Sequence, residues 1–175
     1  AKKLEKPPYF ERMERLNLQG VPFAGALPSP VPLSADEFAA RAEEMLVLDT
    51  RIELGFGAGH VPGALSIALS RVPRFAGWFL PYDRPLLLVG ETDDPSQAVR
   101  DLFRIGYDDL AGTLAGGMLA WHTAGRDSAA IPMLTVPALC RHLDAHEDVW
   151  ILDVRSQGEL AQGGHIPGAH QIHVT

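Results

Sequence analysis

The sequence predicts an α/β protein in which a parallel sheet is flanked by helices. Short, continuous apolar segments alternate along the chain with segments whose apolar residues follow helical spacing, and this alternation is typical of parallel sheets. The apolar segments lack the alternating polar residues of half-exposed strands, so we expect them to be buried on both faces. The opening of this pattern also occurs twice, which predicts one whole unit and the first half of a second.

The repeat relates residues 46–67 to residues 150–172. Each segment begins with an apolar run, continues through Asp-x-Arg and a glycine-containing stretch, and ends in Gly-His-x-Pro-Gly-Ala. Asp49 of the first copy corresponds to Asp153 of the second. Self-similarity of this kind marks a structural unit that is used more than once.

The first elements are expected in the following order. Residues 17–32 are rich in glycine and proline and are expected to form a linker, whereas residues 7–16 carry enough apolar mass to pack on another part of the protein. Ser34 and Glu37 form a capping box that predicts the start of a helix. Residues 45–49 then form the first buried strand.

The alternation resumes after a connection rich in proline and aromatic residues. Residues 84–90 predict a second strand, and residues 96–107 predict an amphipathic helix that ends at Gly106. A further strand over 109–116 and a short helix over 116–125 complete the unit. The connection itself contains Trp78, Phe79 and Tyr82, which are expected to pack in the core or at its edge, with an exposed patch that binds a partner as the second interpretation.

In the second copy, Thr135 is placed to cap a helix whose first turn contains Pro137. An apolar strand over 149–153 and a last strand over 171–174 follow. We expect these residues to lack the central strands that would pair with the first one, which leaves strand edges open.

Composition excludes several classes of protein. With 46% hydrophobic and 21% charged residues, the chain can bury a core. Its net charge of −7 repels phosphate backbones, so we expect no nucleic-acid partner. No run approaches the roughly 18 apolar residues that span a bilayer, and a single cysteine suits a reducing compartment. We therefore expect a cytoplasmic protein that makes no use of a membrane.

These residues resemble the rhodanese superfamily of sulfurtransferases. The matching features are the two Asp-x-Arg strand ends, the two Gly-His-x-Pro-Gly-Ala loops and a Leu-x-Gly-Gly-x-x-x-Trp segment that closes at Trp121. The resemblance implies a five-stranded parallel sheet flanked by helices, and sulfur transfer through a cysteine persulfide as the usual activity. It implies an N-terminal extension and linker over 1–29, a complete domain over 30–127, and the truncated start of a second over 128–175.

A second resemblance concerns the N-terminal residues. PPYFERMERLN and the proline-rich residues after it look like the junction in fusion proteins that carry a metallo-β-lactamase-fold sulfur dioxygenase ahead of rhodanese domains. It implies that this chain is a C-terminal part of such a protein, with the metal site outside it and no cofactor within it. The implied partners are the upstream domain and the remainder of the second rhodanese domain, and assembly into a homo-oligomer stays open.

No cysteine stands at the position that the resemblance implies for the catalytic residue. Counting back from Gly106, the resemblance puts this cysteine at Val89 or Gly90, and neither residue is a nucleophile. The loop that follows is acidic, and carboxylates there would raise the pKa of a thiol and repel an anionic sulfur donor. The degenerate loop comprises Val89, Gly90, Glu91, Thr92, Asp93 and Asp94.

Two pairs of residues at strand ends are candidate functional positions. Asp49 with Arg51, and Asp153 with Arg155, are expected at the carboxyl edge of a sheet, where ligands bind in open α/β folds. For Arg51 we favour a structural or vestigial role that fixes the strand-to-helix turn, because the loop beside it is degenerate. The role of Arg155 stays open.

The histidines and the cysteine are interpreted as structural. His60 and His165 are expected to hold their loops through backbone hydrogen bonds. His142 and His146 have the spacing of one helix face, but no third ligand accompanies them, so no metal site is expected. Cys140 lies in the opening helix of the second copy and is interpreted as a small buried hydrophobe or an ordinary helix thiol.

Three hypotheses about function follow. The leading one is a non-catalytic rhodanese-like scaffold and docking module of a sulfur-metabolism fusion protein that handles persulfide or thiosulfate. The alternative is an active thiosulfate or persulfide sulfurtransferase, using Cys140 or a catalytic cysteine of the second domain beyond Thr175. A third is a metal- or anion-sensing module built on the acidic loop over 91–94. The fragment itself is expected to be inactive, and the parent protein stays open as a sulfurtransferase, a metal-dependent sulfur dioxygenase or hydrolase, or both.

Overall fold

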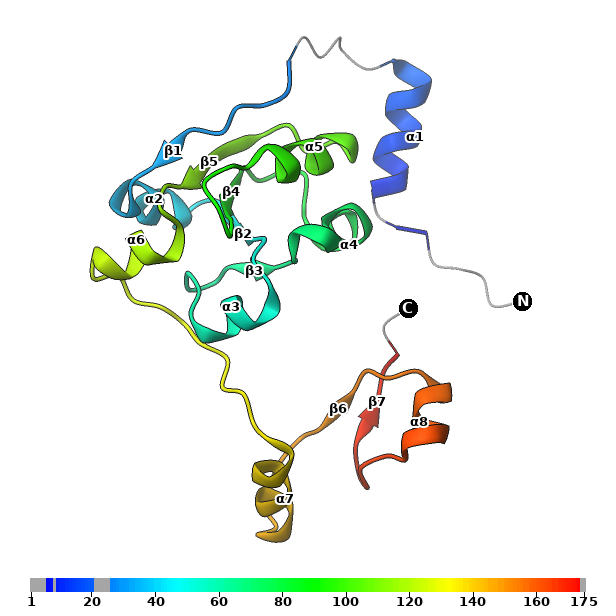
Figure 1. Cartoon of the computed structure of the whole chain (residues 1–175). Helices are drawn as coiled ribbons and strands as arrows, with labels where there is room; N and C mark the ends of the chain where they lie inside the picture. The colour runs from blue at the N-terminus through cyan, green and yellow to red at the C-terminus, as the bar shows by residue number, and fades with distance from the viewer. Residues whose placement is uncertain (1–5, 8, 21–25, 174–175) are drawn as a thin grey trace. The chain divides into compact units, whose positions relative to one another are not determined.

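A computed structural model describes residues 6–7, 9–20 and 26–173. The chain divides into two compact units, Ala1–Pro132 and Met133–Thr175. The first unit holds a five-stranded sheet in the order β1-β5-β4-β2-β3, and every neighbouring pair of strands is parallel (Figure 1). This confirms the expected parallel sheet. Its strands are β1 (Pro32–Leu33), β2 (Leu46–Asp49), β3 (Leu65–Ser66), β4 (Leu86–Val89) and β5 (Leu110–Leu114).

Helices cover both faces of the sheet. One buried cluster joins α4 and α5 to one face, and a second buried cluster joins α2 and α6 to the other. Side chains of β4 alternate between the two clusters, as the period of a strand requires, and all of them are buried. The helices of this unit are α1 (Tyr9–Gln19), α2 (Ala35–Ala42), α3 (Glu53–Ala58), the 3-10 helix η1 (Leu69–Arg71), α4 (Val72–Phe79), α5 (Ser96–Arg104) and α6 (Gly117–Thr123).

Local signals set the helix ends. The Ser34 hydroxyl accepts a hydrogen bond from Glu37 N, and the Glu37 carboxylate accepts one from Ser34 N at 3.0 Å, so the capping box is formed at the start of α2. Helix α5 ends at Arg104, and the chain turns at Gly106 with φ at 87°. This left-handed conformation favours glycine.

The proline- and aromatic-rich connection contains two helices that the sequence pattern did not predict, η1 and α4. Pro73 stands in the first turn of α4, where an N–H has no helical partner. Phe79 is 63% exposed, so the expectation that it packs in the core or at its edge is wrong, because α4 turns its other face to the sheet. Tyr82 is half-buried and stacks on Tyr107, with ring centroids 4.1 Å apart.

The N-terminal helix α1 packs on the sheet-covering helix α4. A Cβ built on Gly77 would lie 2.3 Å from Tyr9 Cδ1, so the Tyr9 ring occupies the space that only a glycine leaves free. The Arg12 guanidinium lies 4.6 Å from the centre of the Tyr82 ring, within cation–π range. Residues 7–16 thus belong to the first unit, as expected from their apolar mass.

The linker differs from the expectation. Helix α1 continues to Gln19 and β1 begins at Pro32, so both ends of the expected linker over 17–32 belong to regular elements. Its residues 21–25 lie outside the described residues. At the other end of the unit, Ala129 pairs with His60 in an antiparallel bridge, which ties the chain just after residue 127 to the first unit.

The second unit, taken by itself, has two helices and a pair of parallel strands within its described residues 133–173. Thr135 caps its first helix through Ala138 N, and Pro137 stands in the first turn, as expected. Its first strand covers only two residues of the expected 149–153. No side chain between residues 133 and 173 is fully buried, so this unit has no packed core. Its elements are α7 (Val136–Asp144), β6 (Leu152–Asp153), α8 (Gln157–Gly163) and β7 (His170–Gln171).

Cys140 is exposed on α7. The interpretation as a small buried hydrophobe is therefore wrong, because the second unit has no core to bury it, and the residue is a free thiol on a helix surface. Among the described helices, none is long and apolar enough to cross a bilayer.

Candidate functional site

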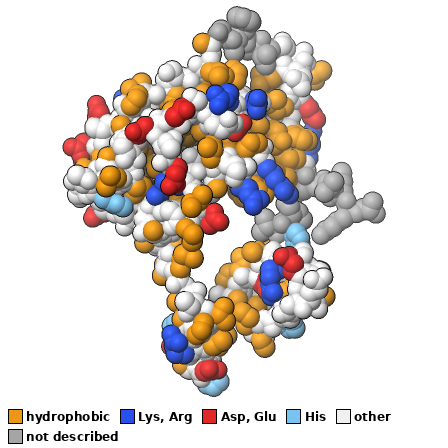
Figure 2. Space-filling model, in the orientation of Figure 1, with side chains coloured by type: hydrophobic (Ala, Val, Ile, Leu, Met, Phe, Trp, Pro, Cys, Tyr) orange, Lys and Arg blue, Asp and Glu red, His pale blue; other side chains and the backbone are white. Residues whose placement is uncertain are grey.

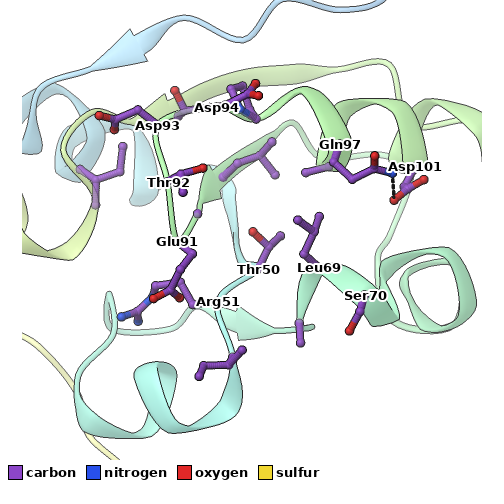
Figure 3. Close-up of a pocket in the computed structure, with 18 of the residues that line it drawn as sticks. Thr50, Arg51, Leu69, Ser70, Glu91, Thr92, Asp93, Asp94, Gln97 and Asp101 are labelled. Carbon is purple, nitrogen blue, oxygen red and sulfur yellow. Dashed lines mark hydrogen bonds between the residues drawn. The ribbon is translucent and has the colours of Figure 1, made fainter.

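A cavity of about 690 Å³ opens where β2 and β4 end, at the carboxyl edge of the sheet. This volume lies within the roughly 300–1,000 Å³ of small-ligand pockets. The turn after β2, the η1–α4 segment, the loop after β4 and helix α5 line it (Figure 3). Because ligands bind at this edge in open α/β sheets, the cavity is the candidate functional site.

Gly90 lines the cavity directly after β4. Val89 is fully buried in the core cluster, so Gly90 is the one of the two expected cysteine positions that lines the cavity. A Cβ built on Gly90 would lie 2.8 Å from the Thr92 carbonyl oxygen. The loop therefore brings a carbonyl oxygen to the place of a thiol side chain, whereas a thiolate is stabilised by a nest of N–H groups.

The acidic loop is held by its own carboxylates. Asp93 Oδ1 accepts a hydrogen bond from Gly116 N at 2.8 Å, which ties the loop to the turn between β5 and α6. Asp94 Oδ1 accepts from Ser96 N at 2.9 Å and from Ser96 Oγ at 2.5 Å. These bonds from Ser96 hold the pKa of Asp94 below its usual range. The loop is thus an ordered acidic structure at the start of α5.

Arg51 is bound by Asp49 at the end of β2. Its Nε lies 3.0 and 3.1 Å from the two Asp49 carboxylate oxygens, and its Nη2 lies 2.7 Å from Asp49 Oδ2. Nη2 also donates to the Gly59 carbonyl at 2.7 Å. Asp49 is fully buried and Arg51 is 9% exposed. The guanidinium therefore ties the strand end to the loop before His60, and Asp49 neutralises its charge.

Four carboxylates line the cavity. The lining residues include one guanidinium, that of Arg51, and Asp49 neutralises its charge. Three of the carboxylates come from the loop, and the fourth, Asp101 of α5, is 5% exposed. Asp101 Oδ2 accepts from Gln97 Nε2 at 2.8 Å (Figure 3), and Arg104 Nη1 lies 3.5 Å from its other oxygen. The sequence pattern did not identify Asp101 as a cavity residue. One signal for it was present, because Asp101 directly precedes the apolar Leu102 in the same helix. The lining is electrostatically unsuited to a sulfur-donor anion.

The second unit repeats the Asp-x-Arg arrangement on its own strand. Arg155 Nε lies 3.0 and 3.1 Å from the Asp153 oxygens, and its Nη2 lies 3.0 Å from the Gly164 carbonyl. The side-chain hydrogen bond from Arg155 lowers the pKa of Asp153 to about 2. The repeat in sequence is therefore also a repeat in side-chain geometry.

The two repeat histidines differ. His60 is buried, its Nδ1 donates to the Phe56 carbonyl at 2.8 Å, and its ring stacks on Phe56 with centroids 3.8 Å apart. His165 is exposed, and no hydrogen bond joins its ring to any described residue. Phe56 corresponds to Leu160 when counted from the helix N-cap and to Ala161 when counted back from the histidine, and neither is aromatic, so the second loop lacks the aromatic partner.

No metal centre is formed by the described part of the chain, where no three His, Cys, Asp or Glu side chains gather closely enough to hold an ion. His142 Nδ1 lies 2.6 Å from Glu147 Oε2 at the end of α7. His146 has the left-handed φ of 53° at that helix end. These histidines thus serve the helix terminus.

Comparison with known proteins identifies the pattern. The family model for the rhodanese-like domain matches residues 34–124 of this chain. A solved metallo-β-lactamase from Staphylococcus aureus is 27% identical over 65% of this chain and 31% of its own, with a TM-score of 0.54. No curated protein matches the sequence.

Two further solved structures share the fold. The rhodanese-like domain of an Anabaena sp. protein is 21% identical, with 59% of this chain and 81% of that domain covered and a TM-score of 0.51. A protein of Bacillus halodurans is 14% identical, with 71% and 87% covered and a TM-score of 0.51. At these identities the likeness concerns the arrangement of sheet and helices.

Proposed function

The chain belongs to the rhodanese-like domain family, and we propose that its complete unit is a non-catalytic member, a scaffold and docking module within a larger protein of sulfur metabolism. One observation carries the proposal. Gly90 stands where the resemblance expects the catalytic cysteine, and a Cβ there would meet the Thr92 carbonyl oxygen at 2.8 Å. The position lacks both the nucleophile and the space for one.

The charge of the cavity supports the same conclusion. Persulfide and thiosulfate chemistry needs a thiolate and an anionic donor side by side, and both are favoured by cations and N–H groups. Here the lining has four carboxylates, and Asp49 already neutralises Arg51. Two independent features, sterics and charge, thus oppose sulfur transfer at this site.

An assay of sulfur transfer from thiosulfate to cyanide tests the proposal. The purified chain is expected to form thiocyanate only at the rate of the protein-free reaction. Gly90→Cys is expected to stay at that rate, because the new side chain meets the Thr92 carbonyl and the acidic loop. The variant's fold is checked by circular dichroism.

Cys140→Ser is the control for the only thiol in the sequence. Thiocyanate formation well above the protein-free rate that survives this substitution would overturn the proposal. Formation that disappears with it would move the activity to Cys140, which is also contrary to the proposal.

The larger protein is proposed to carry a metallo-β-lactamase-fold domain ahead of these residues. The match to the Staphylococcus aureus metallo-β-lactamase supports this, because the present chain covers 31% of that protein at 27% identity. The metal would belong to that domain. The coding sequence on the N-terminal side of Ala1 tests the idea: a histidine- and aspartate-rich metal motif is expected there, and an unrelated sequence would contradict it.

A second candidate function concerns the parent protein. Arg155 and Asp153 repeat the geometry of the first unit, which favours a second rhodanese-like domain, and that domain would supply a catalytic cysteine after Thr175 for sulfur transfer. A longer chain is expected to form thiocyanate and to lose this activity when that cysteine is replaced. For both forms we propose a cytoplasmic location, because a sequence with one cysteine suits a reducing compartment.

A further inference from the structure

We propose that the cavity beside Gly90 docks an extended basic segment of a partner protein. This inference rests on the proposed function, since it names the surface and the partner chemistry of the docking module. Three features of the cavity carry it: an apolar rim, an excess of carboxylates, and the Nη1 group of Arg51, which has no acceptor among the described residues.

The rim of the cavity is apolar and open. Ile52 is 55% exposed and Leu69 is 36% exposed, and both line the cavity together with Pro73. Figure 2 shows hydrophobic, acidic and basic side chains interspersed on the visible face of the first unit. Exposed apolar side chains around a hollow are typical of a surface that binds another protein.

The carboxylates of the lining favour a positively charged ligand. Glu91 is exposed and makes no hydrogen bond or ion pair with any described residue. Asp93 Oδ1 accepts a hydrogen bond from Gly116 N, and Asp93 Oδ2 has no partner among the described residues. A lysine or arginine side chain complements this lining, whereas an anionic ligand is repelled by it.

Arg51 supplies the third feature. Its side chain is 10% exposed and its Nε and Nη2 are bonded, but its Nη1 has no hydrogen-bond partner among the described residues. A Cβ built on Gly55 would lie 3.7 Å from Nη1 and 4.0 Å from Glu91 Oε2, so the donor and a carboxylate stand beside the same glycine. An N–H in this place suits a backbone carbonyl.

An extended peptide meets all three demands. Its carbonyl accepts from Arg51 Nη1, its basic side chain reaches the acidic loop, and its apolar side chain covers Ile52 and Leu69. A bare metal ion would be repelled by the Arg51 guanidinium, and a sulfur-donor anion would be repelled by the carboxylates. The segment is therefore expected to combine basic and apolar residues.

Nuclear magnetic resonance of the isotope-labelled chain tests this with two capped peptides, acetyl-Leu-Lys-Leu-Lys-Leu-amide and acetyl-Leu-Glu-Leu-Glu-Leu-amide. The lysine peptide is expected to shift the amide signals of Gly90, Glu91 and Ala98 in a saturable way. The glutamate peptide is expected to leave them in place. Equal effects of the two peptides, or lysine-peptide shifts confined to other surfaces, would overturn the proposal.

A charge-matched pair of variants sharpens the test. Glu91→Gln with Asp93→Asn removes two carboxylates of the lining and keeps an oxygen for Gly116 N, and the affinity for the lysine peptide is expected to fall about fivefold. Asp108→Asn with Asp109→Asn removes two exposed carboxylates outside the cavity and is expected to leave the affinity unchanged. An equal loss in both would show attraction by net charge alone and would refute the site.

The outcome is separable from that of the proposed function. A chain that transfers no sulfur and binds neither peptide refutes the basic segment while the non-catalytic assignment stands. A chain that transfers sulfur refutes the assignment whatever it binds.

Discussion

At the residue scale, Arg51 donates to both carboxylate oxygens of Asp49 and to the carbonyl of Gly59, and Asp49 is fully buried. The first unit also has an exposed pair of the same chemistry, in which Arg126 and Asp36 are 2.7 Å apart with side chains 40% and 74% exposed. Water screens the exposed pair, whereas loss of one buried partner leaves an uncompensated charge. The two pairs therefore contribute very different amounts to stability, although the shortest N–O distance is 2.7 Å in both.

Arg51→Ala is expected to lower the free energy of unfolding by about 3–5 kcal/mol. The matched change Arg126→Ala is expected to lower it by less than about 1 kcal/mol. Urea unfolding followed by tryptophan fluorescence, to which the buried Trp121 contributes, measures both. Similar losses for the two variants would contradict the structural role of the Arg51 pair.

At the element scale, α1 is attached through a fit of one ring to one glycine. The Tyr9 ring lies where a Gly77 side chain would be, with Cδ1 2.3 Å from the position of a built Cβ. Arg12 adds a cation–π contact with Tyr82 at 4.6 Å. The helix thus belongs to the rhodanese-like unit and is anchored on α4.

Gly77→Ala is expected to lower the free energy of unfolding by about 1–3 kcal/mol, because the methyl group overlaps the Tyr9 ring. In a Tyr9→Ala background the same change is expected to raise it by up to about 1 kcal/mol, because alanine is the better helix former. Chemical denaturation of the four proteins measures the coupling. A change of the same sign in both backgrounds would contradict the packing of α1.

Elements with local signals were predictable from the sequence. The Ser34–Glu37 capping box and the Thr135 cap depend on residues three positions apart, and buried strands such as β4 depend on short apolar runs. Helix α4 was not predicted, because its proline and aromatic residues hide the helical period. Strand β6 is shorter than predicted, because a strand extends only as far as a neighbouring strand pairs with it.

At the scale of the whole molecule, the two units differ in how much they bury. The first has packed clusters on both faces of its sheet. In the second, which has two paired strands, Trp150 is 65% exposed and Leu152 is 42% exposed. A unit without buried side chains has little to resist local opening.

Limited proteolysis with thermolysin is therefore expected to cut residues 133–173 well before residues 30–126. Mass spectrometry of the fragments over time measures the order of the cuts. Equal resistance of the two segments in a monomer would contradict the difference in burial, whereas protection in a dimer would point to pairing of the open strand edges.

The sequence by itself determined the α/β class, the repeat and the absence of a cysteine after β4, because each depends on residue types and short spacings. Only the tertiary structure decided that the Thr92 carbonyl stands over Gly90, that Asp101 is buried at the cavity, and that Arg51 Nη1 has no hydrogen-bond partner among the described residues. Gly90 and Thr92 are two residues apart and Arg51 is eight residues from Gly59, but the loop conformations and the burial of these residues depend on the elements packed around them. Their positions follow from how strands and helices pack, and no local pattern encodes that packing.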